Sequence, residues 1–337
     1  MVKTREIELP GVGEPDILRI RERNLPDPGP GQSLVKVEAT GVSFAEQQMR
    51  LGKYYDQPPF PFVPGYDLVG TVEEGERRGE RVAALTKTGA WADRVLLDSA
   101  DLVAVPEGLE PEVAETAIVN GVTAYRMLHR SAKAKKGQTI VVLGAAGGVG
   151  STLVALARHA GIRVIGTAGP KQLDAVRAAG AEVIDYRSED VPARVRELAP
   201  DGVAAVFDHV GGPGIADSWA MLARGGTLVS YGTASTKDDP GDSRLPVLKL
   251  VGRLALWNVL PNGRSATFFN LWKGARNKDR YRVGLSEDMT AVLNLVAAGE
   301  IDAPIAGRFP LSDAAEALRF AEAGGNTGKV VIVGDAS

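Results

Sequence analysis

The residues best suited to chemistry form a glycine-rich turn, Leu-Gly-Ala-Ala-Gly-Gly-Val-Gly, at positions 143–150. It follows the apolar run Thr139–Leu143, which predicts a strand buried on both faces, and a helical pattern continues to about His159. Small residues between a strand and a helix let backbone N–H groups approach the phosphates of a dinucleotide. The predicted cofactor-binding residues of this turn are Ala145, Ala146, Gly147, Gly148, Val149 and Gly150.

Three positions of such a turn require small residues: the tight bend, the approach to the pyrophosphate, and the contact between helix and strand. Ala145, Gly147 and Gly150 occupy them, so alanine stands where the usual fingerprint has its first glycine. A glycine-rich turn without a ligand is the alternative. The further strand–helix units that follow this turn favour the dinucleotide interpretation.

The end of the next strand distinguishes the two nicotinamide cofactors. An NAD site usually has a carboxylate there, which bonds the ribose 2′-hydroxyl. Positions 165–171 instead read Ile-Gly-Thr-Ala-Gly-Pro-Lys, with a hydroxyl and an ammonium but no carboxylate. A 2′-phosphate needs a cation without a nearby anion, so we predict NADPH, with Lys171 and Thr167 on its 2′-phosphate. The alternative for Lys171 is a solvated lysine in a helix first turn.

The elements that must position these residues alternate between strands and helices, which is typical of a parallel sheet with covering helices. The predicted strands are Arg163–Gly166, Glu182–Ile184, Val203–Phe207 and Thr227–Ser230, and the predicted helices are Lys171–Ala179, Val191–Leu198 and Ile215–Leu222. After Gly232 the pattern loosens into a polar loop at Ala234–Arg244 and a strand or helix at Leu248–Leu260. The last predicted elements are helices Glu287–Ala298 and Ser312–Ala323 and strand Lys329–Val333.

The first third of the chain has a different pattern. Short strands separated by Gly and Pro are predicted at Ser33–Ala39, Leu68–Val72, Arg81–Leu85 and Trp91–Leu97. Several such strands in succession suggest a barrel-like or irregular β domain. A chain of 337 residues is long enough for both domains.

Composition excludes several classes of function. The net charge of −3 argues against a nucleic-acid surface or a polybasic membrane anchor. The chain has no cysteine, which excludes disulfides, thiolate catalysis and cysteine-built zinc sites. The N-terminus is charged and lacks the apolar core of a targeting segment. We therefore expect a cytoplasmic protein without nucleic-acid or membrane partners.

Further motifs extend over almost the whole chain: ATGVSFAE at 39–46, VPGYDLVG at 63–70, GVTAY at 121–125, DHVGG at 208–212 and GKVV at 328–331. Together with the glycine-rich turn they resemble the zinc-free medium-chain dehydrogenases/reductases, especially the quinone oxidoreductase (zeta-crystallin-like) branch. The resemblance implies an α/β fold with a Rossmann doubly wound parallel sheet and a GroES-like β domain. It implies a GroES-like catalytic domain at 1–122, completed by 266–337, and an NADP-binding domain at 123–265, with nicotinamide and substrate in the cleft between them.

The resemblance also implies roles for single residues. In this branch, a Lys and a Tyr that match Lys171 and Tyr186 contact the 2′-phosphate end of the cofactor. It assigns Thr123 to the nicotinamide end and adds Val210 and Gly232 to the cofactor-binding residues. The alternative for Thr123 is an ordinary hydroxyl at a helix start.

Two catalytic candidates follow from the same resemblance. Tyr54 matches a tyrosine often found at the cleft, where it would donate a proton or form a wall of the pocket. Ser43 stands where the family commonly has Asn, and Glu46 replaces the usual Asp; Ser43 would bond the carboxamide or the substrate oxygen, or cap a loop. Zinc-dependent relatives carry Gly-His-Glu where this chain has Gly65-Tyr66-Asp67, so a zinc site is not expected.

The resemblance implies an NADPH-dependent, metal-independent reductase that transfers hydride to quinones or to enones, in which C=C is conjugated to C=O. One alternative is an enoyl-thioester reductase, with the basic run Lys273–Arg282 binding the phosphates of CoA or a carrier protein; otherwise this run is solvated. Another alternative is an NADPH-binding protein with little turnover. The family further implies a homodimer formed by joining Rossmann sheets edge to edge, through an apolar segment such as Arg253–Val259.

Overall fold

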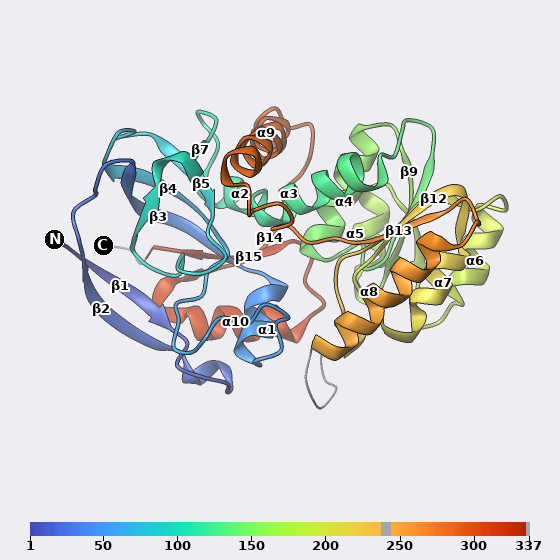
Figure 1. Cartoon of the computed structure of the whole chain (residues 1–337), viewed down its shortest axis with the longest axis horizontal. Coiled ribbons are helices and arrows are strands. Elements are labelled where there is room, and N and C mark those ends of the chain that lie inside the picture. The colour runs from blue at the N-terminus through green and yellow to red at the C-terminus, as the bar shows by residue number, and fades with distance from the viewer. Residues whose placement is uncertain (237–243, 335–337) are drawn as a thin grey trace. The chain divides into compact units, whose positions relative to one another are not determined.

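The computed structural model describes residues 1–236 and 244–334 and divides into two compact units. Unit 1 comprises Met1–Val122 and Gly274–Ser337, and unit 2 comprises Thr123–Lys273 (Figure 1). Helix α3 (Val119–Tyr125) contains the first division. Most of the loop predicted at Ala234–Arg244 lies outside the described residues. Among the described residues, no helix combines the length and the apolar character needed to cross a bilayer.

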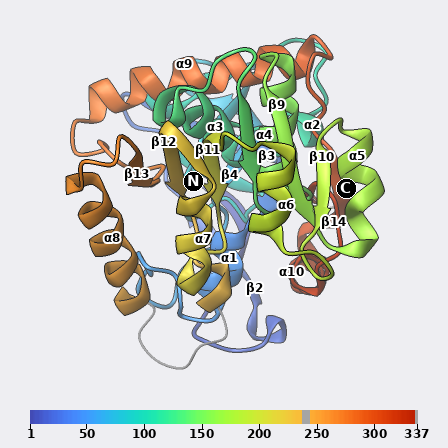
Figure 2. The ribbon, with the colours of Figure 1, turned by 90° about the vertical axis from the view of Figure 1, so that its right-hand side faces the viewer.

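Unit 2 is built on a six-stranded parallel sheet with the order β10-β9-β8-β11-β12-β13 (Figure 2). Its strands are β8 (Thr139–Val142), β9 (Arg163–Ala168), β10 (Glu182–Asp185), β11 (Val203–Asp208), β12 (Leu222–Ser230) and β13 (Ser265–Phe268). Its helices are η3 (Arg126–Ala132), α4 (Gly148–His159), η4 (Pro170–Gln172), α5 (Leu173–Ala178), α6 (Val191–Leu198), η5 (Gly212–Gly214), α7 (Ile215–Ala220), η6 (Ala234–Thr236) and α8 (Arg244–Val259). The strand order reverses between β8 and β11, which is where doubly wound sheets bind ligands.

The apolar strand centres explain why this sheet forms. Val141, Ile165 and Val206 are fully buried in one core with residues of the covering helices. The predicted α/β doubly wound fold is confirmed, and helix Val191–Leu198 has the predicted bounds. The expected domain boundary after Ser265 falls inside β13, whose Phe268 is paired with Ser230 of β12, so residues 266–273 belong to unit 2.

Unit 1 contains a seven-stranded, mostly antiparallel sheet with the order β14-β15-β3-β4-β5-β7, in which β6 also pairs with β3, and a separate β1-β2 ribbon. Its strands are β1 (Val2–Glu8), β2 (Arg19–Leu25), β3 (Gln32–Val42), β4 (Asp67–Glu74), β5 (Arg81–Leu85), β6 (Arg94–Asp98), β7 (Val103–Ala104), β14 (Ile305–Pro310) and β15 (Lys329–Val333). Its helices, besides the start of α3, are η1 (Pro15–Ile17), α1 (Phe44–Arg50), η2 (Ser99–Asp101), α2 (Pro111–Thr116), α9 (Lys278–Ala297), η7 (Leu311–Asp313) and α10 (Ala314–Ala323).

The C-terminal strand completes this β domain. Residues Val330–Val333 of β15 pair with Ala39–Val42 of β3, although almost 290 residues separate them in the sequence. The expectation that a C-terminal segment completes the N-terminal β domain is thereby met. Trp91, predicted in a strand, precedes β6; it is fully buried, and its indole N–H donates to the Gly41 carbonyl at 3.0 Å.

The expectation of a sheet edge at Arg253–Val259 is wrong. This segment is the second half of α8, whose Leu250 and Leu254 are buried in the core of unit 2. The two leucines are four residues apart, so helical spacing brings them to one face. The edge strand next to β12 is β13 instead.

Candidate functional site

The glycine-rich turn lies at the carboxyl ends of β8 and β9. Gly144 bends the chain with φ +67°, a conformation that favours glycine. The Ala145 N–H donates to the Thr167 carbonyl at 2.9 Å, and the Leu143 N–H donates to the Phe207 carbonyl at 3.0 Å. These bonds fix the turn to the strands on both sides of β8.

Helix α4 begins directly after this turn. Its N-cap, Gly147, provides no side-chain hydrogen bond, so the first N–H groups of the helix remain available to an anion. A Cβ on Gly147 would lie 3.5 Å from the Gly144 oxygen, its nearest neighbour, whereas a Cβ on Gly150 would lie 2.1 Å from the same oxygen. Gly150 is therefore required by packing within the turn, and Gly147 is not.

The alanine at the first small position is matched by a glycine on the neighbouring strand. A Cβ on Gly166 of β9 would lie 2.7 Å from the Cβ of Ala145. The methyl group that Ala145 adds thus occupies space left by Gly166. The departure from the usual fingerprint is accommodated within the fold.

The different surroundings of Gly147 and Gly150 predict different effects of an alanine at each position. We expect Gly150→Ala to lower the free energy of unfolding by about 1–3 kcal/mol, because its methyl group overlaps the backbone of the turn. Gly147→Ala should retain stability but weaken NADPH binding, because its methyl group would lie in the way of a pyrophosphate bound at the start of α4, as the sequence predicts. Thermal unfolding and fluorescence titration with NADPH measure the two effects. Equal NADPH affinities for Gly147→Ala and the native chain would contradict the assignment of Gly147.

Lys171 and Tyr186 follow the carboxyl ends of neighbouring strands, β9 and β10, and both are exposed. The Tyr186 hydroxyl would lie 3.5 Å from a Cβ placed on Gly169, which locates it against the loop that carries Lys171. Thr167 is buried, and its hydroxyl accepts the Gly144 N–H at 3.0 Å. Thr167 therefore holds the glycine-rich turn, which leaves Lys171 and Tyr186 as the exposed members of this group.

The loops after β11 and β12 bring Val210 and Gly232 together. The Asp208 carboxylate accepts the N–H groups of Val210 and Gly211, both at 2.8 Å, and so folds the loop after β11. A Cβ on Gly232 would lie 2.7 Å from the His209 carbonyl oxygen. The requirement for glycine at 232 thus comes from a close approach of the two loops.

His209 connects this loop to the glycine-rich turn. Its Nδ1 lies 3.1 Å from the Leu143 carbonyl, and a Cβ on Gly144 would lie 2.4 Å from its ring. Burial lowers the pKa of His209, which favours the neutral ring. The DHVGG motif does not reveal the contact of His209 with Leu143, because Leu143 lies at the end of another strand. Thr123 is buried on α3.

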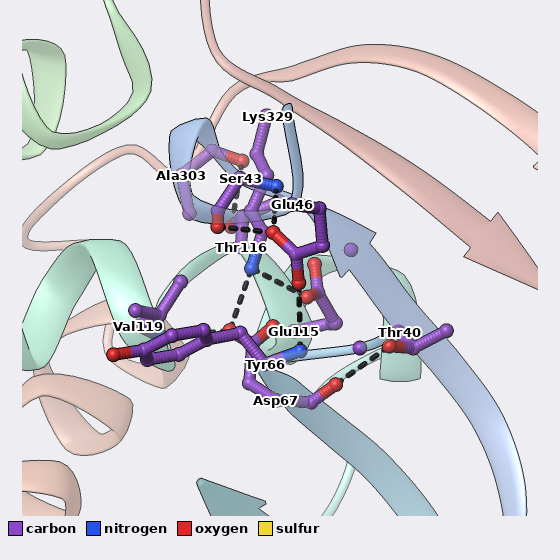
Figure 3. Close-up of polar contacts among 12 residues, drawn as sticks. Thr40, Ser43, Glu46, Tyr66, Asp67, Glu115, Thr116, Val119, Ala303 and Lys329 are labelled. Carbon is purple, nitrogen blue, oxygen red and sulfur yellow. Dashed lines mark hydrogen bonds and ion pairs between the residues drawn. The ribbon is translucent and has the colours of Figure 1, made fainter. Parts of the chain in front are cut away.

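In unit 1, Ser43 is the N-cap of α1 (Figure 3). Its hydroxyl accepts the Ala45 N–H at 3.2 Å and donates to the Glu46 carboxylate, which in turn accepts the Ser43 N–H at 2.9 Å. This reciprocal arrangement is a capping box. Ser43 and Glu46, which both depart from the family pattern, therefore cap α1 together. Of the two roles expected for Ser43, the structure shows capping.

Glu46 also reaches the tyrosine pair. Its other carboxylate oxygen accepts the Tyr66 N–H at 2.7 Å, and the Tyr66 hydroxyl lies 3.0 Å from the Tyr54 hydroxyl. Burial raises the pKa of Glu46, and burial followed by the neighbouring tyrosines raises the pKa of Tyr54. Tyr54 is thus held as a neutral phenol, which can donate a hydrogen bond. The sequence analysis did not predict that Tyr66 is the hydrogen-bond partner of Tyr54.

A buried ion cluster lies beside this pair (Figure 3). The Lys329 ammonium donates to Asp67 at 2.6 Å and to Glu115 at 2.5 Å, and all three side chains are almost completely buried. Asp67 also accepts the Val119 N–H at 2.8 Å, at the start of α3. A Cβ on Gly41 would lie 2.2 Å from Lys329 Cε, so glycine at 41 leaves room for the lysine.

The cluster holds two acids and one base. Burial raises the pKa of Glu115 well above its ordinary value; the Lys329 charge opposes this effect and Asp67 adds to it. Burial opposes the charge of Lys329, but Asp67 and Glu115 outweigh it and raise the pKa of Lys329. The cluster therefore holds a charged lysine and favours a proton on Glu115, which avoids an excess of buried negative charge.

The basic run Lys273–Arg282 does not form one surface element. It crosses the division between the units, and α9 begins within it at Lys278. The Arg282 guanidinium donates to Asp101 at 2.7 Å and to Asp98 at 2.5 Å. This arginine is therefore engaged within unit 1, which weakens the interpretation of the run as a phosphate-binding surface.

Comparisons with known proteins agree with the fold. Residues 179–332 match the family model "Zinc-binding dehydrogenase", and residues 29–107 match "Alcohol dehydrogenase GroES-like domain". The chain is 30% identical to the human synaptic vesicle membrane protein VAT-1 homolog, over 98% of this chain and 86% of that protein. It is 30% identical to a 2-haloacrylate reductase from Burkholderia, over 95% and 96%. The solved structure of Escherichia coli quinone oxidoreductase complexed with NADPH is 26% identical, with a TM-score of 0.84 over 98% and 99%.

The first family model is named for zinc, and the residues present do not fit a zinc site. Tyr66 stands in the Gly65-Tyr66-Asp67 sequence where zinc relatives have histidine, and the chain has no cysteine. Within residues 1–236 and 244–334, no group of three or more His, Asp or Glu side chains is placed to hold a metal ion.

Proposed function

Because the chain belongs to the quinone oxidoreductase family of medium-chain dehydrogenases/reductases, we propose that it is an NADPH-dependent reductase of quinones or enones. The observation that carries this proposal is the uncapped start of α4 after a glycine-rich turn, beside a strand end that presents Lys171 and no carboxylate. The names of two similar proteins support it, since one is a quinone oxidoreductase complexed with NADPH and the other reduces a haloacrylate, which contains a conjugated double bond.

Different residues of unit 2 bind different parts of the cofactor. We assign the pyrophosphate to the N–H groups of Gly147, Gly148 and Val149, because helix N-termini favour phosphate. Lys171 and Tyr186 bind the 2′-phosphate. Thr123, Val210 and Gly232 contact the nicotinamide half, and Thr167 acts indirectly by holding the turn. When bound, NADPH supplies the hydride.

Tyr54 stabilises the acceptor as a hydrogen-bond donor. When hydride adds to a conjugated C=C–C=O group, negative charge develops on the oxygen, and a neutral donor favours that charge. The raised pKa of Tyr54 keeps its proton in place and makes it a poor acid. We therefore propose that Tyr54 stabilises the oxygen, that water delivers the proton to carbon, and that Ser43 has no catalytic role beyond capping α1.

Tyr54→Phe should lower kcat for an enone by about 10²-fold, as loss of one oxyanion donor does in other enzymes. The KM for NADPH should stay unchanged. Tyr66→Phe removes only the partner of Tyr54 and should have a smaller effect. Steady-state kinetics over about pH 6–9 should show the same pH profile for the native chain and Tyr54→Phe, because the pKa of Tyr54 lies above this range. An unchanged kcat would show that Tyr54 only forms a wall of the pocket.

The proposed function is tested by NADPH consumption with a panel of acceptors: 1,4-benzoquinone, 9,10-phenanthrenequinone, a small enone and crotonyl-CoA, with NADH in parallel. We expect turnover of the quinones or the enone with NADPH and little with NADH. A strong preference for crotonyl-CoA would identify an enoyl-thioester reductase. Binding of NADPH without any turnover would identify a nucleotide-binding protein with little activity.

We also propose that two identical chains associate. The family resemblance implies a homodimer.

A further inference from the structure

His209 is one of three histidines in the chain, and the proposed reaction does not use it. It is the first residue after β11, and its side chain is half-buried. Its Nδ1 lies 3.1 Å from the Leu143 carbonyl. Because a carbonyl oxygen can only accept a hydrogen bond, the neutral ring carries its proton on Nδ1. The other ring nitrogen, Nε2, therefore has a lone pair and is an acceptor.

The fold leaves this acceptor unused. Nε2 of His209 has no hydrogen-bond partner in the part of the chain that the structure describes. Burial lowers the pKa of His209, although the neighbouring Asp208 charge opposes this effect, so the ring stays neutral and keeps its lone pair near neutral pH. A polar atom that is positioned by the fold and has no partner there is a candidate for contact with a ligand.

Contacts with neighbouring segments of unit 2 hold the His209 ring in place. The His209 carbonyl accepts the Ala234 N–H at 3.0 Å, and the ring lies beside Tyr231, with ring centroids 6.0 Å apart. A Cβ on Gly144 would lie 2.4 Å from Cε1 of the ring and 3.0 Å from Nε2. Glycine at 144 thus leaves the space that the ring occupies, and Nε2 is held beside the start of the glycine-rich turn.

The strand order places His209 on one side of the turn and the residues proposed for the 2′-phosphate on the other. Lys171 and Tyr186 follow β9 and β10, the turn follows β8, and His209 follows β11, in a sheet with the order β10-β9-β8-β11. In NADPH, the pyrophosphate likewise separates the 2′-phosphate of adenosine from the nicotinamide ribose. A pyrophosphate at the turn would therefore bring the nicotinamide ribose to the end of β11, at the point where the strand order reverses.

The hydroxyl groups of this ribose are the chemical match for Nε2. Phosphate oxygens are acceptors, and they would meet the Nε2 lone pair with lone pairs of their own. The carboxamide of nicotinamide also has N–H donors, but it lies beyond the ribose, farther from the pyrophosphate. A ribose hydroxyl is both a donor and the donor nearest to the pyrophosphate in this half of the cofactor.

We propose that Nε2 of His209 accepts a hydrogen bond from a hydroxyl group of the nicotinamide ribose. This inference rests on the NADPH binding proposed above and adds to it a residue that positions the sugar next to the nicotinamide. The two ring nitrogens then have different roles. Nδ1 attaches the loop after β11 to the glycine-rich turn through the Leu143 carbonyl, and Nε2 binds the cofactor.

Two amide variants separate the roles of the two nitrogens. Asparagine places its amide near the position of Nδ1, so His209→Asn should keep the bond to Leu143 and lose the acceptor. Fluorescence titration should then show a Kd for NADPH raised by roughly 3–10-fold, the effect of one lost hydrogen bond. Glutamine reaches the position of Nε2, so His209→Gln should keep a nearly native Kd but lose the Leu143 bond and unfold at a lower temperature. The opposite order of affinities would show that His209 only holds the turn.

Fragments of the cofactor locate the contact. The compound 2′-phospho-ADP-ribose has the ribose hydroxyls but no nicotinamide, and adenosine 2′,5′-bisphosphate has neither. In calorimetric titrations, His209→Asn should weaken binding of 2′-phospho-ADP-ribose as much as binding of NADPH, and it should bind the bisphosphate like the native chain. A loss for NADPH alone would transfer the contact to the carboxamide and overturn the ribose assignment. Weaker binding of the bisphosphate as well would show that the variant disturbs the turn, which would also overturn it.

His159→Asn is the matched control. His159 is exposed and is the last residue of α4, at the opposite end of the helix from the turn, so this variant should change none of the three affinities. Native affinity of His209→Asn for all three ligands would overturn only the contact of His209. A native chain that binds neither NADPH nor the bisphosphate would overturn the proposed function together with this contact. NADPH oxidation with the acceptor panel, measured separately, tests the reaction independently of the contact.

Discussion

Lys329→Met should lower the free energy of unfolding by about 3–5 kcal/mol, because it leaves Asp67 and Glu115 without their buried cation. Methionine fills a similar volume, so the loss would come from charge rather than from a cavity. The same change releases Asp67, whose carboxylate accepts the Val119 N–H at the start of α3. Urea denaturation measures the loss.

The loss should depend on pH in a defined direction. Burial already raises the pKa of Glu115 and the Lys329 charge opposes that rise, so without the ammonium Glu115 holds its proton still more tightly in the folded chain than in the unfolded chain. The folded state then binds more protons, so the stability of the variant falls as pH rises above about 4. The gap between variant and native chain should therefore be smaller at about pH 5 than at about pH 8.

Lys3→Met is the control for this prediction. Lys3 bonds Glu22 at 2.8 Å, but both side chains are largely exposed, so water and salt replace the interaction easily. We expect no measurable loss for this variant. Similar losses for Lys329→Met and Lys3→Met, or a gap independent of pH, would show that the buried cluster does not stabilise the fold through its charges.

Lys171→Ala should raise the KM for NADPH by about 10–100-fold, the cost of one charge-assisted bond to a phosphate. The KM for NADH, which lacks the 2′-phosphate, should hardly change. The kcat should be retained, because the proposed contact of Lys171 is with the 2′-phosphate and not with the nicotinamide. Steady-state kinetics with both cofactors at constant ionic strength make the comparison.

Arg177→Ala provides the matched control on the next helix. Arg177 is exposed and paired with Asp174 of its own helix at 2.6 Å, so its loss should alter neither KM. If Lys171→Ala changed the KM for NADPH and NADH equally, Lys171 would be a general surface charge and not a ligand of the 2′-phosphate.

Local patterns predicted the Rossmann half of this chain well. The strand-helix alternation after Thr139 gave elements close to the observed ones, because each buried strand and amphipathic helix carries its own periodicity. The edge of the same sheet was predicted incorrectly. Residues 253–259 are apolar on both faces, because one face packs inward through Leu254 while the other remains exposed, and such a run does not distinguish strand from helix.

The site residues of unit 1 were less predictable. Tyr54, Tyr66 and Glu46 meet through hydrogen bonds between a helix and two loops, which no spacing in the sequence reveals. Lys329 meets Asp67 across 262 residues through a strand pairing. For Ser43, capping was only the alternative prediction, although the Ser-x-x-Glu sequence at 43–46 is a recognisable capping signal.

Transfer of deuterium from NADPH labelled at nicotinamide C4 to a small enone tests the central claim most directly. Both C4 epimers of the cofactor would be used, and the product analysed by NMR. We expect one epimer to deliver its label to the β-carbon of a saturated ketone. A label on the carbonyl carbon of an alcohol, or binding of NADPH without any labelled product, would contradict it.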